Sequence, residues 1–404
     1  MTLRKTTIAL AAGLAAATSL ASIAQAQSVK IGALGGITGP IESLVPAILD
    51  GARFAITQVN EQGGFFADGL QGEMITGDTT CADAARAADA GDRVVNVDQV
   101  VAIVGALCSG ATIAVANNAA IPGGVLMISP ASTSPSLTTL ADNDLVFRTA
   151  TSDAYQGGVL ARLVRAKGVD TVAVTYVNND YGKGFAEAFA AAFASEGGTV
   201  AANQAHEDGK ADYRAEIGNL SATGAQALVV LAYADGSGQT ILRQSLEGGD
   251  FSTFFGGDGM VSDTLVDNVA GIEGKITLTK PSAPEVPGRA AFGDAITAAG
   301  LSADGPFVPN GYDAAFLIAL AIEKAGSADR AAVAAAVREV AMAPGEVILP
   351  GEWAKAKALI AAGTDINYEG AAGSHEFDAA GDVPGFFVEA VIADGKVTDL
   401  APVR

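Results

Sequence analysis

Apolar and polar positions alternate between two patterns from about residue 29 onward. Short apolar runs rich in β-branched residues, such as residues 100–104, are typical of strands buried on both faces. Longer segments with apolar residues three and four positions apart, such as residues 82–97, are typical of amphipathic helices. Because parallel strands need crossover helices, this alternation predicts an α/β protein whose parallel sheets are covered on both sides.

The alternating pattern occurs twice. The first series predicts strands at 29–34, 73–78, 100–104 and 125–129, with helices at 43–62, 82–97 and 109–118. The second predicts helices at 153–167, 184–196, 213–222 and 236–247, with strands at 171–177, 199–206, 227–231, 254–256 and 274–279. Three prolines then interrupt the pattern, and helices follow at 288–299, 311–326 and 329–342. These last helices have few strands beside them, so we expect them to cover the first sheet.

This order predicts two lobes. The length of 404 residues also suggests two domains. We expect residues 27–148 and 280–383 to form an N-terminal lobe, and residues 149–279 and 384–404 a C-terminal lobe. The predicted fold is two doubly wound parallel-sheet lobes joined by a three-strand hinge, which would let a cleft open and close. In the tail, residues 373–397 show hairpin-like alternation around Asp378–Asp382.

The N-terminus has the features of a secretory signal peptide. Arg4 and Lys5 precede an apolar stretch at 8–23, which ends in Ala24-Gln25-Ala26. Cleavage after Ala26 would export a mature protein. It would also change the net charge from −21 to −23, because the leader carries two positive charges and no negative ones. Such a charge would repel nucleic acid and anionic lipid, so neither is an expected partner.

Only two cysteines occur, Cys81 and Cys108. In an oxidising compartment a disulfide between them would stabilise the fold by roughly 3 kcal/mol in the chain-entropy model. A metal pair is the alternative, but His206 and His375 are the only histidines and no ligand cluster is evident, so we expect no metal. A free reactive thiol is the remaining possibility.

Polar residues follow several predicted strands at their carboxyl ends, where ligands of parallel sheets bind. Ser109 follows the strand at 100–104 and would lie where the next helix begins, near free N–H groups that suit an anion. A serine there is also a good N-cap, and that alternative stays open. Hydroxyl residues at 129–134 reach the same edge, whereas Tyr181, Tyr233 and Asp258 follow strands of the second lobe. Such a site suits an amino-acid zwitterion.

A family resemblance rests on motifs that keep their order along residues 29–404. They are Thr38-Gly39-Pro40, Asn60-Glu61-Gln62-Gly63-Gly64, Cys81, Leu107-Cys108-Ser109, Ile128-Ser129-Pro130-Ala131-Ser132-Thr133, Phe147-Arg148-Thr149, Asp153 with Gln156-Gly157, Tyr181-Gly182, Tyr233 and Thr279-Lys280-Pro281. With these motifs the chain resembles the leucine/isoleucine/valine-binding proteins of bacterial ABC importers, which are type I periplasmic binding proteins.

The resemblance implies roles for individual residues. Ser109 and Thr133 would bind the carboxylate of an amino acid through hydroxyl and backbone N–H groups. The Ala131 carbonyl, the Thr133 hydroxyl and the Asp258 carboxylate would bind its ammonium group, and Ser132 belongs to the same turn. Family members commonly have glutamate where this chain has Asp258, which is one methylene shorter.

The remaining positions concern the walls of the site. Tyr181 and Tyr233 would close it from the second lobe. Leu44 replaces an aromatic residue that packs on the ligand side chain in the family, and Phe307 is a candidate for the other apolar wall. Each has a simpler interpretation, since Tyr181 could be a rim residue, Tyr233 a core residue and Asp258 a turn residue.

The resemblance implies a monomeric periplasmic protein that binds an amino acid, branched-chain or otherwise apolar or aromatic, and delivers it to a membrane permease without a cofactor. A sensor for a small carboxylate or amide is an alternative with the same fold. A secreted hydrolase using Ser109 is a further alternative, but neither histidine lies in a recognisable nucleophile context and no Gly-x-Ser-x-Gly elbow occurs. The ligand itself stays open.

Overall fold

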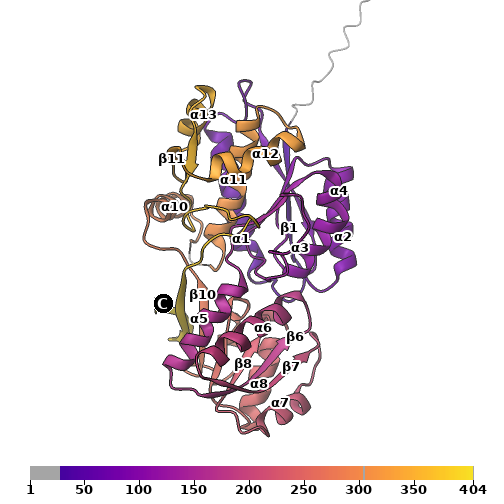
Figure 1. Cartoon of the computed structure of the whole chain (residues 1–404), viewed down its shortest axis with the longest axis vertical. Coiled ribbons are helices and arrows are strands. Elements are labelled where there is room, and N and C mark those ends of the chain that lie inside the picture. The colour runs from indigo at the N-terminus through magenta and orange to yellow at the C-terminus, as the bar shows by residue number, and fades with distance from the viewer. Residues whose placement is uncertain (1–27, 304, 404) are drawn as a thin grey trace, which may run out of the picture.

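The computed structural model describes residues 28–303 and 305–403, and the predicted signal peptide lies outside them. Figure 1 shows two lobes stacked along the long axis of the molecule. The first lobe contains the N-terminal segments together with later helices coloured orange, and the second contains the middle of the chain. In the described residues we find no helix that is both long and apolar enough to cross a membrane.

The first lobe is built on a five-stranded parallel sheet of order β2-β1-β3-β4-β5. Its strands are β1 (Val29–Gly35), β2 (Gly72–Asp78), β3 (Ala102–Val104), β4 (Leu126–Ser129) and β5 (Val146–Arg148). Helices α1 (Val45–Glu61), α2 (Ala84–Asp92), α3 (Ser109–Val115) and α4 (Ile121–Gly123) connect them, with π-helical segments at Arg93–Val97 and Ala116–Ala120. The sequence pattern predicted the first four strands but not β5.

The second lobe contains a seven-stranded sheet of order β14-β13-β10-β9-β8-β6-β7. Strands β6 (Thr171–Val177), β7 (Thr199–His206), β8 (Ala227–Leu231), β9 (Phe254–Gly256) and β10 (Ile276–Pro281) are parallel. Helices α5 (Asp153–Ala166), α6 (Asp180–Ser195), α7 (Arg214–Ser221), α8 (Gln239–Gly248) and α9 (Thr264–Asn268) connect them, with short helical turns at Ala234–Gly238 and Asp258–Met260.

The tail completes the second sheet as an antiparallel hairpin. Strands β13 (Phe387–Ala393) and β14 (Lys396–Pro402) pair with each other, and β13 pairs with β10. The predicted hairpin around Asp378–Asp382 is therefore wrong in position, because the strands turn at residues 394–395. Residues 378–382 form a local turn in which the Gly381 N–H donates to the Asp378 carbonyl at 3.1 Å.

The last helices return to the first lobe, as the sequence predicted. They are α10 (Pro287–Ala298), α11 (Val308–Ala325), α12 (Arg330–Ala341) and α13 (Trp353–Ala361), with a small parallel pair β11 (Glu346–Ile348) and β12 (Ile366–Tyr368). Helix α11 packs closely on α1 because glycines meet backbone there. A Cβ at Gly51 would lie 2.6 Å from the Val308 carbonyl oxygen, and one at Gly311 would lie 2.3 Å from that of Ile48.

The chain passes between the lobes three times, at 149–152, 282–286 and 369–386. The Thr149 hydroxyl donates to the Asn310 carbonyl at 2.9 Å, and the Asn310 amide donates back to the Thr149 carbonyl at 2.6 Å. The Ser282 N–H donates to the Phe386 carbonyl at 2.9 Å, which ties the second crossing to the third. Three adjacent strands of chain are the hinge expected of this fold.

Candidate functional site

Ser109 lies at the start of α3, after the loop 105–108 that follows β3, and beside the disulfide Cys81–Cys108. The N-cap position belongs to Cys108, which makes no side-chain cap, so the N-cap interpretation of Ser109 is wrong. Its hydroxyl instead accepts a hydrogen bond from the Ser134 N–H at 3.1 Å. The disulfide fits against β1 because Gly36 has no side chain, since a Cβ there would lie 2.5 Å from Cys81 Sγ. Ser109 is thus held on a braced turn.

The turn after β4 holds the predicted residues Ala131, Ser132 and Thr133. The Ser129 hydroxyl donates to the Ala106 carbonyl at 2.5 Å and accepts from the Ser132 N–H at 3.0 Å. The Ser132 hydroxyl lies 2.7 Å from Thr112 Oγ1 and is fully buried. Ser132 therefore shapes the turn from inside and does not line the pocket described below.

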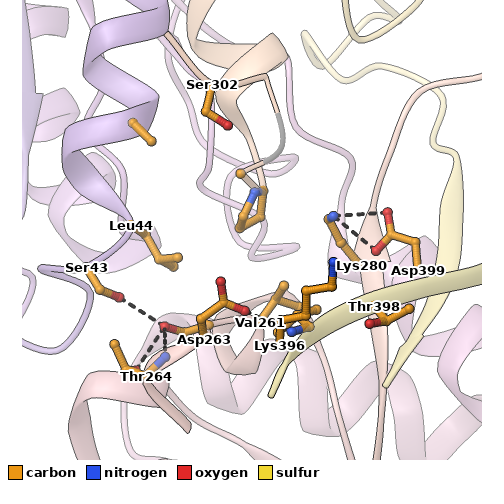
Figure 2. Close-up of a pocket in the computed structure, with 15 residues that line it drawn as sticks. Ser43, Leu44, Val261, Asp263, Thr264, Lys280, Ser302, Lys396, Thr398 and Asp399 are labelled. Carbon is orange, nitrogen blue, oxygen red and sulfur yellow. Dashed lines mark hydrogen bonds and ion pairs between the residues drawn. The ribbon is translucent and has the colours of Figure 1, made fainter. Parts of the chain in front are cut away.

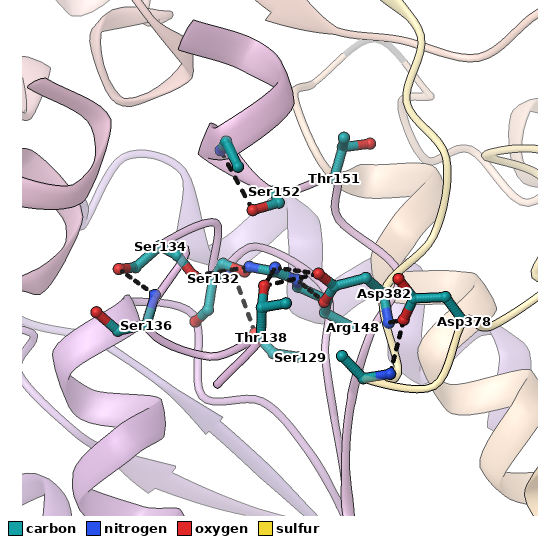
Figure 3. Close-up of polar contacts among 12 residues, drawn as sticks. Ser129, Ser132, Ser134, Ser136, Thr138, Arg148, Thr151, Ser152, Asp378 and Asp382 are labelled. Carbon is teal, nitrogen blue, oxygen red and sulfur yellow. Dashed lines mark hydrogen bonds and ion pairs between the residues drawn. The ribbon is translucent and has the colours of Figure 1, made fainter. Parts of the chain in front are cut away.

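A buried arginine holds the same turn (Figure 3). Arg148, which is 2% exposed, donates from Nε and Nη2 to the two carboxylate oxygens of Asp382 at 2.6 and 2.7 Å. Its Nη1 donates to the Ser134 carbonyl at 2.9 Å, and Nη2 donates to the Thr138 hydroxyl at 2.8 Å. Because Asp382 lies in the third crossing, this network links the hinge to the turn that carries Thr133.

The second lobe contributes aromatic rings and an acid. Tyr181, at the start of α6, stacks on Tyr233 with ring centroids 5.1 Å apart. The Tyr181 hydroxyl donates to Asp258 Oδ1 at 3.3 Å and accepts from the Gly259 N–H at 3.2 Å. A Cβ at Gly259 would lie 2.6 Å from the Ala232 carbonyl oxygen, so a glycine lets this turn approach β8. The turn after β9 thereby places Asp258 next to the tyrosines.

These two halves meet in a small pocket between the lobes. Seven residues predicted for the site line it, together with five for which no ligand contact was predicted: Leu44, Ser109, Ala131, Tyr181, Tyr233, Asp258 and Phe307, with Ile41, Ile48, Leu107, Cys108 and Gly259. Ser132 and Thr133 do not line it. Its volume of about 20 Å³ is close to that of one water site, so an amino acid can enter only if the lobes move apart.

Hydrogen bonds across the cleft hold the lobes in this arrangement. The Ser43 N–H donates to Asp235 Oδ2 at 2.9 Å, and the Ser43 hydroxyl lies 3.2 Å from that of Ser262. On the other side of the pocket the Ser134 hydroxyl donates to the Asp180 carbonyl at 2.8 Å. The structure is therefore a closed form, and these hydrogen bonds must break for the lobes to open.

A larger cavity of about 740 Å³ adjoins the pocket at Leu44. Figure 2 shows Leu44 and Ser302 of the first lobe facing Val261, Asp263 and Lys396 of the second lobe across this space. Unlike the small pocket, it carries cationic and anionic groups at its rim. Lys280 donates there to both carboxylate oxygens of Asp399 at 3.0 and 3.1 Å. The two spaces share Leu44 as a lining residue.

Burial dominates the electrostatics of the site. Burial raises the pKa of Asp258 to about 7, although hydrogen bonds from Tyr181 and Gln156 favour its charged form. Burial also raises the pKa of Asp153 well above its ordinary value, and the nearby charge of Asp258 raises it further. The pKa of the Tyr181 hydroxyl is raised well above its ordinary value, first by burial and then by Asp258, so this tyrosine stays neutral.

Three residues near the site had no role in the sequence analysis, although all three lie in the quoted motifs. They are Arg148, Asp153 and Gln156, and each is buried. Asp153 begins α5, and its N–H donates to the Thr133 carbonyl at 2.7 Å. In the sequence, only its place in a family motif sets Asp153 apart. An aspartate that follows Ser152 at the start of a helix otherwise looks like an ordinary first-turn acid. Among the described residues, no group of three histidines, cysteines or acids could hold a metal.

Comparison with known proteins gives consistent results. The sequence profile of the family described as periplasmic binding protein matches residues 28–382. The "Leucine-, isoleucine-, valine-, threonine-, and alanine-binding protein" of Pseudomonas aeruginosa is 33% identical over 316 residues, which cover 78% of this chain and 83% of that protein.

Solved structures share the fold. The leucine-binding protein LivK of Thermotoga maritima superposes with a TM-score of 0.78 at 24% identity, covering 93% of this chain and 99% of that one. The branched-chain amino acid transporter substrate binding protein LivJ of Streptococcus pneumoniae, solved with isoleucine, superposes with a TM-score of 0.75 at 24% identity, covering 93% and 100%. At this identity the likeness concerns the architecture.

Proposed function

The chain belongs to the periplasmic binding protein family, and we propose that it binds a small aliphatic amino acid between its lobes as the solute-binding component of an ABC importer. The observation that carries the proposal is the polarity of the pocket. Hydroxyl and amide groups of the first lobe face a buried carboxylate and two tyrosines of the second lobe. A zwitterion has the matching polarity, because its two ends need opposite partners.

The carboxylate of the amino acid binds to the first lobe. Ser109 supplies a hydroxyl and the start of α3, where N–H groups lack helical partners. Thr133 contributes its own hydroxyl and N–H from the turn that Arg148 braces. Both positions are buried when the lobes are closed, which strengthens hydrogen bonds to a charged group.

The ammonium group and the side chain bind on the other sides of the pocket. Asp258 and the Ala131 carbonyl accept from the ammonium group, with Tyr181 orienting Asp258. The apolar side chain packs against Ile48, Leu107 and Phe307. Leu44 lies at the opening toward the larger cavity, so the side-chain end of the pocket can widen there.

The energetics permit useful affinity. Hydrogen bonds to charged groups contribute roughly 1.5–3 kcal/mol each, and four or five of them with apolar burial exceed an association cost of about 4–15 kcal/mol. Micromolar or tighter binding follows. The two lobes, with boundaries at about residues 148, 280 and 383, move as the units that open and close.

The biological setting follows from the family. The mature protein acts in the periplasm after removal of residues 1–26, and its closed form is what a membrane permease recognises. It returns the amino acid unchanged, so the protein is a carrier and has no enzymatic activity. It works as a monomer without a cofactor.

A ligand screen tests the proposal. The mature chain is mixed with each common amino acid and with short carboxylic acids, and its melting temperature is measured. We expect leucine, isoleucine or valine to raise the melting temperature with increasing concentration, because a ligand that binds only the folded state stabilises it. Calorimetry on the hits then measures affinity. If none of the amino acids stabilises the protein, the proposal is refuted.

A further inference from the structure

Buried polar atoms without hydrogen-bond partners gather at one place beside the pocket. In the part of the chain that the structure describes, both carboxylate oxygens of Asp153, the amide oxygen of Gln156 and the Thr133 hydroxyl oxygen lack a partner. The three side chains are 0 to 1% exposed. The Thr133 hydroxyl lies close enough to favour the charged form of Asp153, but its geometry does not complete a hydrogen bond.

These side chains do not line the small pocket itself, but Asp153 and Gln156 both interact with Asp258, which does line it. The Asp153 N–H donates to the Thr133 carbonyl at 2.7 Å, so the two residues are directly linked. Gln156 lies one turn further along α5, hydrogen bonds to Asp258 and would lie 3.2 Å from a Cβ at Gly257. The charges of Asp153 and Asp258 interact with each other. Two carboxylates thus share one buried space.

The carboxylate oxygens of ionised Asp153 and the amide oxygen of Gln156 can only accept, and the Thr133 hydroxyl oxygen can accept as well, which indicates what is missing. A buried acceptor without a donor costs about 1–3 kcal/mol, and native proteins rarely leave several together. A primary ammonium group brings three N–H donors and one positive charge to such a place. Next to the carboxylate of Asp153, a carboxylate or amide oxygen of the ligand would add another acceptor and would be repelled.

We propose that the ammonium group of the amino acid binds between the carboxylates of Asp153 and Asp258, and that this pair holds one proton when the site is empty and releases it to solvent when the ammonium binds. The inference rests on the proposed amino-acid binding and deepens it. It makes Asp153 a ligand-binding residue and makes a primary amine a requirement for the ligand.

The charged groups around the pair support a shared proton. Burial raises the pKa of each carboxylate, and the charge of Asp258 raises that of Asp153 further, so ionisation of both at once is disfavoured. Arg148 is the nearby cation, but Asp382 binds its guanidinium through two hydrogen bonds, so its charge is already balanced. Tyr181 and Tyr233, the other titratable groups facing the pair, have raised pKa values and stay neutral.

The test is calorimetry of L-leucine binding in two buffers of different ionisation enthalpy, which counts the protons exchanged. For the wild-type protein at about pH 5.5 we expect close to one proton released per leucine, falling toward zero at about pH 8.5. In Asp153→Asn affinity should fall about 10- to 100-fold through the loss of one ionic hydrogen bond, and part of the proton release should remain, because burial by itself raises the pKa of Asp258. The matched control is Asp313→Asn, at a fully buried aspartate that does not line the pocket, and this variant should keep both the affinity and the proton count.

A second measurement needs no variant. 4-Methylpentanoate is leucine without its ammonium group, and we expect it to bind the wild-type protein at least about 100-fold more weakly than leucine. Leucine binding without proton release, equal binding of 4-methylpentanoate, or unchanged leucine affinity in Asp153→Asn would each overturn the inference while leaving amino-acid binding intact. If no amino acid binds the wild-type protein, the proposed function fails and the inference fails with it.

Discussion

Two aspartates, Asp313 and Asp153, are both fully buried, yet their surroundings are opposite. Asp313, on α11, accepts hydrogen bonds from the Tyr368 hydroxyl at 2.6 Å and from the Ala371 and Ala372 N–H groups at 2.8 and 2.7 Å. Asp153, on α5, has no hydrogen-bond partner for either carboxylate oxygen. The carboxylate oxygens of Asp313 therefore have hydrogen-bond donors within the protein, whereas those of Asp153 have none.

The difference separates a structural acid from a functional one. The hydrogen bonds of Asp313 fasten the segment after β12 to α11 and involve no residue that lines the pocket. Asp153 carries the cost of burial without compensation in the empty protein, as residues at binding sites often do. An unpaired buried acid beside a closing cleft is therefore a better indication of a ligand site than burial alone.

Replacing each aspartate by alanine should give the largest contrast. Asp313→Ala should lower the free energy of unfolding by about 3–5 kcal/mol, because it leaves three buried donors unpaired. Asp153→Ala should leave that free energy unchanged or raise it by up to about 2 kcal/mol, because it removes an uncompensated buried acid. Urea denaturation of the ligand-free proteins measures both. Equal losses in the two variants would contradict the distinction.

The comparison extends to His206, a buried base with a hydrogen-bond partner for each ring nitrogen. Its ring nitrogens lie 2.7 Å from the Thr175 hydroxyl and 2.9 Å from that of Ser237, and burial lowers its pKa to about 4. Between the unfolded pKa of about 6.5 and pH 4, the unfolded chain binds a proton that the folded protein does not. The free energy of unfolding should therefore fall by up to about 3 kcal/mol as pH decreases through this range.

The control for this prediction is His206→Gln, which removes the histidine contribution to the pH dependence. The difference between the two proteins in urea denaturation at about pH 7 and about pH 4 isolates it. The pair Asp153 and Asp258 changes the free energy of unfolding with pH in the opposite direction. Because their pKa values are raised, the empty protein loses stability as pH rises from about 4 to about 7. A variant with the wild-type pH dependence would refute the assignment to His206.

Replacing Asp258 tests whether the acid that lines the pocket binds the ligand. Asp258→Ala should weaken leucine binding by about 2–3 kcal/mol, since it removes an ionic hydrogen bond to the ammonium group. The fold should survive, because the Tyr181 hydroxyl can turn to other partners. Calorimetry measures the affinity, and circular dichroism checks the fold. Unchanged affinity would remove Asp258 from the site.

The smallest expected effect concerns the closed form itself. Ser134→Ala removes the hydrogen bond to the Asp180 carbonyl across the cleft, which contributes about 0.5–1.5 kcal/mol. The variant should populate the open form more and bind leucine up to about tenfold more weakly. Small-angle scattering without ligand measures the opening. Thr139→Ala is a control on the same segment, because the Thr139 hydroxyl bonds within its own lobe. Identical scattering of Ser134→Ala and wild type would contradict the role of this contact.

Hydrophobic periodicity predicted most of the fold because strands and helices there are long and regular. Strands β5, β11 and β12 were not predicted. Each has only three residues, which is too short to show a period, and each contains a polar or charged residue, unlike the equally short β3 and β9. The turn at 378–382 has the composition of a hairpin loop. The carboxylate of Asp382, however, accepts a hydrogen bond from Arg148, which lies 234 positions away in the sequence. A local pattern cannot report such a partner.

Those site residues that follow a predicted strand could be found from the sequence. Ser109 and Asp258 are polar residues after apolar strands, and the rule for parallel sheets brings them to one edge. Asp153 opens a helix and resembles an ordinary first-turn acid in sequence. Its significance lies in the donors that it lacks, and a missing contact is visible only in three dimensions. Ser132 is the opposite case: the sequence predicted it to be a ligand-binding residue, but its hydroxyl contacts Thr112 in the protein interior.

A crystal structure of the mature protein grown with L-leucine tests the central claim most directly. We expect leucine between the lobes, with its carboxylate at Ser109 and Thr133 and its ammonium nitrogen within about 3.2 Å of a carboxylate oxygen of both Asp258 and Asp153. Leucine bound outside the cleft, or with its ammonium group turned away from both aspartates, would contradict the account.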